Sequence, residues 1–209
     1  MRRTVVALLL IAFKLGLGAA AQEPFITVAV YNRAAMKTET LLSGEREASR
    51  ILGTAGVPMH WQNCRTAPGG VGDNCLAAMN DNTLVLTIVS RSPQQALKAE
   101  EMGQALQNVD GNGSHCYIFR SRVDEIAAFA HISSERLLDA AIAHELGHLL
   151  KGLNSHSPQG VMSGHWGERE IRAVGRGGLG FTKQDIEQIR KKLHQASSAG
   201  LQMDRITVQ

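Results

Sequence analysis

The amino-acid sequence predicts one α/β (α+β) domain in which a mixed, twisted β-sheet packs against a prominent helix. Short apolar runs rich in β-branched residues predict the strands. Segments with apolar residues at helical spacing lie between and after these runs. The 209 residues suit a single domain preceded by a processed leader.

Residues 1–21 are typical of a secretory signal peptide. The basic start MRR precedes the apolar run VVALLLIAF, which is short for a bilayer span, and the small residues of GLGAAA suit cleavage after Ala21. An uncleaved N-terminal anchor is the alternative, although Lys14 interrupts the apolar run. We therefore expect a secreted or periplasmic protein, with one domain over residues 22–209 and a catalytic core over about 24–195.

The charge of the chain belongs to the predicted leader. The formal net charge of +3 comes from 22 basic and 19 acidic residues. Removing Arg2, Arg3 and Lys14 with the leader leaves 19 residues of each sign. Charge therefore gives no reason to expect a nucleic-acid or anionic-membrane partner.

Two of the three cysteines are expected to pair. Cys64 and Cys75 flank the turn-rich stretch RTAPGGVGDN, and in an exported protein a disulfide between them would contribute roughly 2–3 kcal/mol. Two free thiols are the alternative. Cys116 lies in an apolar strand-like segment, so we expect a buried thiol, with an intermolecular disulfide as the alternative.

Three strands are predicted in the first half of the mature chain. Residues 24–32 are rich in β-branched and apolar types. Val57, Met59 and Trp61 alternate with other residues, as on one face of a strand. Residues 82–90 form a nearly continuous apolar run, which suits a strand buried on both faces.

A helix is predicted between the first two strands. Residues 39–53 have apolar residues at helical spacing, with Leu42, Ile51 and Leu52 expected to face the core. A partly helical segment is expected over 94–107.

The best predicted helix covers residues 133–152. Ser133 or Ser134 can cap its start, and Glu135 adds a negative charge to the first turn. Gly152 is well placed to end it.

Two further elements flank this helix in the sequence. Residues 115–123 predict a strand, and residues 182–193 predict a second helix. Thr182 is a candidate cap for the second helix, and Ile186 and Ile189 lie on its apolar side.

The helix over 133–152 carries a candidate zinc site. His144 and His148 are one helical turn apart, so both imidazoles leave the same face and can bind one Zn²⁺. Glu145 leaves at another angle and can reach a water molecule on the open side of the metal as a general base. The alternative is a surface helix with two chance histidines.

The stretch HELGHLLKGLNSHSPQGVMSG resembles the metzincin family of zinc metallopeptidases, whose pattern is H-E-x-x-H-x-x-G-x-x-H followed by a Met-turn. Met162 in GVMSG looks like the Met-turn methionine and stands fourteen residues after His148, as in the matrixin branch. Residues 137–166 are particularly similar to exported bacterial proteins reading HELGHLLLG-x-NSHS-x-x-G-x-M.

The chain departs from the metzincin pattern between these points. Lys151 and Asn154 stand where the family has glycine and histidine, and Gly152 and His156 follow one and two places later. His156 is therefore the expected third ligand, at a shifted position.

Three other residues compete for the place of third ligand. Glu168 is the main alternative, with Glu170 and His165 behind it, because a carboxylate about twenty residues after His148 is compatible with a gluzincin arrangement.

The resemblance implies a zincin fold with a C-terminal helix, one catalytic Zn²⁺, and hydrolysis of peptide bonds with Glu145 as general base. It also implies a protein or peptide substrate paired with the strand over 115–123. A non-catalytic zinc-fold protein that binds a peptide or partner, and a zinc amidase with a non-peptide substrate, are the alternatives. Glu145 argues against the first, since a structural zinc site needs no general base.

Overall fold

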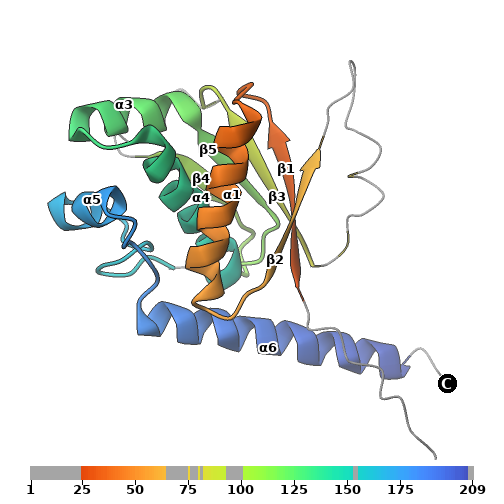
Figure 1. The fold of residues 1–209 in the computed structure, drawn as a ribbon. Helices are drawn as coiled ribbons and strands as arrows, with labels where there is room; N and C mark the ends of the chain where they lie inside the picture. Colours follow the sequence, from red (N-terminus) through yellow and green to blue (C-terminus); the bar gives the residue numbers. More distant parts are fainter. Residues whose placement is uncertain are drawn as a thin grey trace, which may run out of the picture.

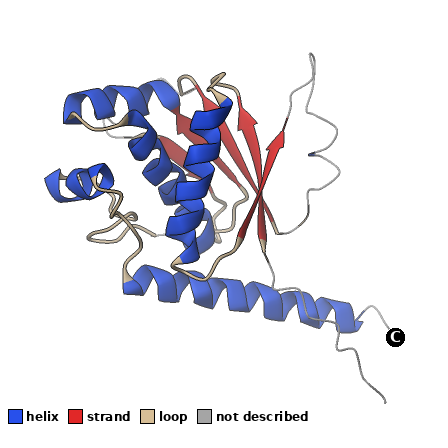
Figure 2. Ribbon diagram, viewed as in Figure 1, coloured by secondary structure: helices blue, strands red, loops and turns tan. Residues whose placement is uncertain are grey.

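The computed structural model describes residues 25–64, 75, 80, 82–92, 101–152 and 155–206. They form a five-stranded mixed sheet with helices packed on one face, as predicted (Figure 1, Figure 2). The predicted leader lies outside the described residues. Among the helices of the described part, none has the length and apolar character needed to cross a membrane.

The sheet has the order β2-β1-β3-β5-β4. The first four strands in this order run parallel, and β4 is antiparallel to β5 at the edge. The bounds are β1 (Ile26–Asn32), β2 (Met59–Cys64), β3 (Thr83–Val89), β4 (Gly103–Leu106) and β5 (His115–Phe119). The expectation of partial helix over 94–107 is wrong for residues 103–106, which form the edge strand β4. This strand pairs with β5, and no local pattern in the sequence predicts that pairing.

Five helices accompany the sheet in the described part of the chain, namely α1 (Thr38–Gly53), α3 (Arg120–Ala130), α4 (Ser134–Lys151), α5 (Glu168–Gly175) and α6 (Lys183–Ile206). The prediction of strand over 120–123 is wrong, because α3 begins directly after β5. Val123 and Ala127 lie one helical turn apart and are the buried residues of α3.

The apolar stripe of α1 differs by one residue from the prediction. Leu41, Ile51 and Leu52 are buried, whereas Leu42 is 39% exposed. Leu41 lies on the same helical face as Ala48 and Ile51, and the next residue is turned about 100° away from that face. The prediction that Leu42 faces the core is therefore wrong, and Leu41 takes its place.

Helix α4 is the central element of the fold. It contacts α1, α3, α5 and α6 as well as β4 and β5, and Figure 1 shows it beside α1 on the covered face of the sheet. Ser133 caps the helix by accepting a hydrogen bond from the Arg136 backbone N–H at 3.3 Å. Gly152 follows the last residue with φ of 91°, a conformation that glycine adopts without strain. Both ends of the helix are as predicted.

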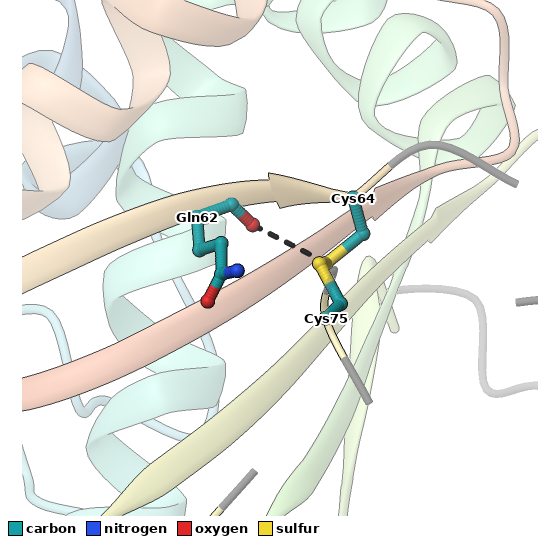
Figure 3. The surroundings of a disulfide bond; sticks show 3 residues. All are labelled: Gln62, Cys64 and Cys75. Atoms are coloured by element: carbon teal, nitrogen blue, oxygen red, sulfur yellow. Dashed lines mark hydrogen bonds between the residues drawn. A yellow bond between two sulfur atoms is a disulfide. The ribbon is translucent and has the colours of Figure 1, made fainter. Parts of the chain in front are cut away.

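The two faces of the sheet are covered differently. The main core joins the sheet to α1 and α4, and β3 is buried along all but its last residue. Ala29, Tyr31 and Val85 point to the opposite face and pack with Cys75. A disulfide joins Cys64 to Cys75 there, with Cys64 Sγ 3.4 Å from the carbonyl oxygen of Gln62 (Figure 3). Cys116 is a buried free thiol.

Candidate metal centre

Three histidines converge at the C-terminal half of α4. Each of His144, His148 and His156 offers a ring nitrogen, and these nitrogens all lie within 4.8 Å of one another. The ring centroids of His148 and His156 are 4.7 Å apart. The two helical histidines face each other with their Nε2 atoms 2.9 Å apart. The structure thus brings His156 to the pair despite its shifted place in the sequence.

The tautomer of His144 is fixed by a backbone carbonyl. Its Nδ1 lies 2.6 Å from the oxygen of Val161. A carbonyl only accepts, so Nδ1 carries the proton and Nε2 keeps a free lone pair directed at the cluster. Trp166 packs edge-on against the His144 ring and donates from Nε1 to the same Val161 oxygen at 3.2 Å.

His148 is held by a hydroxyl group. Its Nδ1 lies 2.5 Å from Ser155 Oγ, and Ser155 is buried. Outer hydrogen bonds of this kind orient a histidine and raise its basicity toward a metal. The ring plane of His148 is therefore set by the residue that immediately precedes His156.

Both helical histidines are neutral near pH 7. The pKa of His144 is lowered to about 4, mainly by burial, with smaller contributions from electrostatic interaction with His156 and Lys151, and the hydrogen bond to Val161 opposes this shift. The pKa of His148 is lowered to about 3, mainly by burial and also by electrostatic interaction with His144, His156 and Lys151. Neutral imidazoles are the form that binds metal ions.

The third histidine is positioned differently, because His156 is exposed. Its ring lies against Gly164, where a β-carbon would come within 3.1 Å of the ring atoms Cγ and Nδ1. The absence of a side chain at Gly164 therefore leaves the room that this ring occupies.

The rival ligands do not join the cluster. Glu168 begins α5, lines the same cleft and pairs with Arg172, with a side chain that is 86% exposed. Glu170 pairs with Arg169, and His165 lies in the wall of the cleft. Within the described residues, the group of metal-binding side chains consists of the three histidines alone.

The donor set fits a single zinc ion. Three imidazole nitrogens at about 2.0–2.1 Å from a tetrahedral zinc lie roughly 3.3 Å from one another. The separation of 2.9 Å within the helical pair and the limit of 4.8 Å for all three bracket this value. The low histidine pKa values agree with this donor chemistry.

Met162 is fully buried against α4. A β-carbon at Gly147 would overlap the Met162 sulfur, so the absence of a side chain at this point of α4 lets the methionine lie against the helix. The backbone at Ser157 runs beside the backbone at Met162, because the Ser157 N–H donates to the Met162 carbonyl at 2.7 Å.

Glu145 points from α4 toward the edge strand. An added β-carbon at Gly103 would lie 2.8 Å from Glu145 Oε1, which shows how closely the carboxylate approaches β4. The pKa of Glu145 is raised to about 8, mainly by burial and also by the negative charge of Glu101, while a hydrogen bond from the Ala105 backbone opposes both. A nearby dication would favour the ionised form.

The three histidines and Glu145 lie in a cleft with a volume of about 1040 Å³. Its walls are β4, α3, α4 and the segment from Ser155 to Ile171. Ile126, Phe129 and Ile171 give the cleft an apolar section beside the cluster. The space is large enough for several residues of an extended peptide.

The strand beside the cleft is β4 and not β5. The prediction that the strand over 115–123 pairs with substrate is wrong, because β5 already has β3 on one side and β4 on the other. The Phe119 N–H donates to the Met102 carbonyl, and this bond fixes which residues of β4 direct their backbone hydrogen-bonding groups toward β5. Gly103 and Ala105 therefore direct their backbone polar groups away from β5.

Several residues of the site escaped sequence reasoning. Ser155 and Lys151 lie within the motif, and the serines on either side of His156 were a signal that the segment makes specific hydrogen bonds. Gly103 and Ala105 carry no such signal. They reach Glu145 only because the antiparallel edge strand lies along α4.

No protein-family model matches the chain, and no curated protein matches it. Archaemetzincin from Methanopyrus kandleri is 20% identical with a TM-score of 0.48, over 81% of this chain and 96% of that one. Metalloproteinase-II from Bacteroides fragilis is 12% identical with a TM-score of 0.47, over 80% of this chain and 53% of that one, so this chain spans about half its length. A Thermotoga maritima protein is 9% identical with a TM-score of 0.34, over 82% and 95% of the two chains. All three identities are low, so the chemistry of this chain is inferred from its own residues.

Proposed function

We propose that this chain is an exported zinc-dependent endopeptidase. The observation that carries the proposal is the convergence of His144, His148 and His156 in a cleft that also holds the buried carboxylate Glu145. Three histidine ligands leave the fourth position of a tetrahedral zinc open, which is the arrangement of a catalytic rather than a structural site.

His144, His148 and His156 hold one zinc ion, and Met162 supports the site from below. Zinc in such a site acts as a Lewis acid toward a carbonyl group and toward water. The Val161 carbonyl and the Ser155 hydroxyl keep the helical imidazoles in place. Support for His156 over Glu168 comes from its place in the cluster, since Glu168 is exposed and paired with Arg172.

Glu145 is the general base. It accepts a proton from the attacking water and delivers a proton to the leaving amine. The Ala105 N–H holds one side of the carboxylate, and the close packing of Gly103 excludes water from that side. The carboxylate is thereby fixed beside the histidine cluster rather than free to turn.

The substrate is an extended peptide that lies along β4. The outward-facing N–H and carbonyl of Gly103 and the carbonyl of Ala105 offer hydrogen bonds to a peptide main chain, as in other cases of strand addition to a sheet edge. The apolar section formed by Ile126, Phe129 and Ile171 lies within the same cleft. Binding mainly through the main chain supports internal cleavage of proteins or peptides.

Export is supported by the disulfide and by the sequence of the leader. Cys64 and Cys75 are joined, and disulfides persist in oxidising compartments. Residues 1–21 have the layout of a signal peptide.

The proposal is tested by zinc content and peptide cleavage in the purified wild-type protein and in Glu145→Gln. Wild type should bind one zinc per chain and cleave members of an unstructured peptide library at internal bonds. Glu145→Gln should keep the zinc and lose roughly 10²–10⁴-fold in kcat, the range of general-base catalysis.

Glu168→Gln is the matched control, because it neutralises a carboxylate in the same cleft outside the histidine cluster. Its cleavage rate should stay close to that of wild type. Stoichiometric zinc without cleavage of any peptide would favour a peptide-binding role, and wild-type protein without zinc would refute the metal site.

A further inference from the structure

The segment that carries His156 is fastened to a buried ion pair. Lys151, the last residue of α4, has a side chain that is only 1% exposed, and its ammonium group lies 2.5 Å from Asp185 Oδ1 of α6. The same ammonium group donates to the carbonyl of Ser155 at 2.6 Å and to the hydroxyl of Ser157 at 3.2 Å. It therefore bonds the residues immediately before and after His156.

Asp185 is itself anchored at the start of α6. Its Oδ2 accepts from the Thr182 backbone N–H at 2.8 Å and from the Thr182 hydroxyl at 2.7 Å, and Thr182 Oγ1 accepts in return from the Asp185 N–H at 3.2 Å. This is the reciprocal arrangement of a capping box. The Ser157 hydroxyl also donates to Asp185 Oδ1. The ion pair therefore links the segment around His156 to both α4 and α6.

A buried ion pair of this kind is not needed for stability alone. Removing two charges from water is costly, and well-packed apolar residues often replace such pairs with no loss of stability. The ion pair is therefore better explained by the segment of the chain that it holds in place. Burial does not fix the exposed His156, whereas Lys151 is bonded to the backbone carbonyl of Ser155 before it and to the side-chain hydroxyl of Ser157 after it.

The position of Lys151 in the motif explains why the segment around His156 needs an additional anchor. It replaces the glycine of the metzincin pattern, and the histidine that follows stands two residues later than in that pattern. A longer stretch between His148 and the third histidine has more conformations, and ordering it costs entropy. The three partners of the Lys151 ammonium restrict that stretch near His156.

We propose that Lys151 and Asp185 are positioning residues that hold His156 in place as the third metal ligand. The proposal rests on the zinc site proposed above. Lys151 contributes through the backbone of Ser155 and the side chain of Ser157, and touches neither the metal nor the substrate.

The test is the zinc affinity of the purified chain, measured by competition with a chromophoric chelator. The main variant is Lys151→Met with Asp185→Asn, which leaves no buried unpaired charge and keeps an oxygen for Thr182. Its zinc affinity should fall about 10–100-fold, the usual effect of losing an outer support of a ligand. Its Co²⁺ derivative should show a changed visible absorption, because one imidazole ligand is lost or displaced.

A double-mutant cycle with His156→Ala separates positioning from general stability. If Lys151 acts through His156, the two substitutions at 151 and 185 should weaken zinc binding much less in the His156→Ala background than in wild type. An equal loss in both backgrounds would overturn the proposal. Ser157→Ala gives a second route if the double variant does not fold, since it leaves the ion pair in place and removes only the bonds of the Ser157 hydroxyl. Zinc affinity unchanged from wild type in Ser157→Ala would then overturn the proposal.

Lys192→Met is the matched control. Lys192 also donates from α6 to backbone carbonyls, at Gly111 and at Leu149 near the end of α4, without bonding Ser155 or Ser157. Its zinc affinity should equal that of wild type. Wild type without zinc would refute the metal site itself, whereas zinc bound equally by wild type and by the folded double variant would refute only the role of Lys151 and Asp185.

Discussion

Gly147 and Met162 lie in direct contact, so that a β-carbon on Gly147 would overlap the methionine sulfur. Phe181 closes the same space, with Cε1 3.1 Å from that β-carbon position. Met162 is fully buried and stands next to Val161, whose carbonyl holds His144. The packing of the Val161–Met162 segment against α4 therefore depends on a missing side chain in the middle of a helix.

Gly147→Ala should destabilise the protein, although alanine is the better helix former. Overpacking a filled core costs about 1–3 kcal/mol, more than the gain of up to ~1 kcal/mol from helix propensity. Thermal unfolding measures the net effect as a lower Tm. Gly53→Ala in α1 is the control, because nothing lies within 4 Å of its added β-carbon. A Tm for Gly147→Ala at or above that of wild type would contradict the packing described here.

Gly164→Ala should weaken zinc binding with little change in stability. The new β-carbon would lie 3.1 Å from two ring atoms of His156, a residue that is exposed and can swing outward without disturbing the core. Chelator competition measures the zinc affinity, and thermal unfolding of the zinc-free protein checks the fold. Gly180→Ala has open space around its added β-carbon and is the control. An affinity equal to that of wild type would mean that His156 does not need this position.

Ser155→Ala should lower zinc affinity about 10–100-fold, because it removes the hydrogen-bond partner of a metal ligand. The lost contact is the one of 2.5 Å between Ser155 Oγ and His148 Nδ1. Ser114→Ala is a matched control, since it removes a serine–histidine contact of 3.2 Å with His115 that lies outside the cleft. Equal zinc affinities for the two variants would count against the orienting role of Ser155.

Asp139 should make the zinc-free protein less stable as the pH rises from about 4 to 7. Burial, the largest cause, and the negative charges of Glu47 and Glu135 together raise the pKa of Asp139 to about 7. The unfolded chain has the ordinary aspartate pKa of about 3.9, so the folded state binds more protons across this window and the free energy of unfolding falls with rising pH. From roughly pH 8 upward both states are ionised, and this contribution becomes constant.

Asp139→Asn should remove that slope and make the protein more stable than wild type at pH 8. The expected gain is on the order of 3 kcal/mol, from about 1.4 kcal/mol per pKa unit with allowance for relaxation. Urea unfolding at pH 4.5, 6 and 8 with a chelator present measures it. Asp110→Asn, at an exposed carboxylate, should behave as wild type. Identical pH slopes for wild type and Asp139→Asn would contradict this assignment.

Local sequence patterns predicted the elements whose causes are local. The apolar run of β3, the Ser133 cap and the terminal Gly152 each depend on neighbours in the chain, and each was identified from the sequence. Leu42 was assigned to the wrong side because spacing alone does not fix the rotation of a helix about its axis. The strand β4 was missed because a short edge strand is stabilised mainly by its partner.

The sequence by itself determined which chemical groups the candidate site contains. Two histidines one turn apart, a glutamate between them and a methionine at a set distance depend only on helical geometry and chain length. Tertiary structure decided how these groups are held. Gly103 reaches Glu145 from 42 residues away, and Asp185 reaches Lys151 from 34 residues away. Contacts at such separations depend on how the edge strand and α6 pack against α4, and no periodicity within one segment encodes that packing.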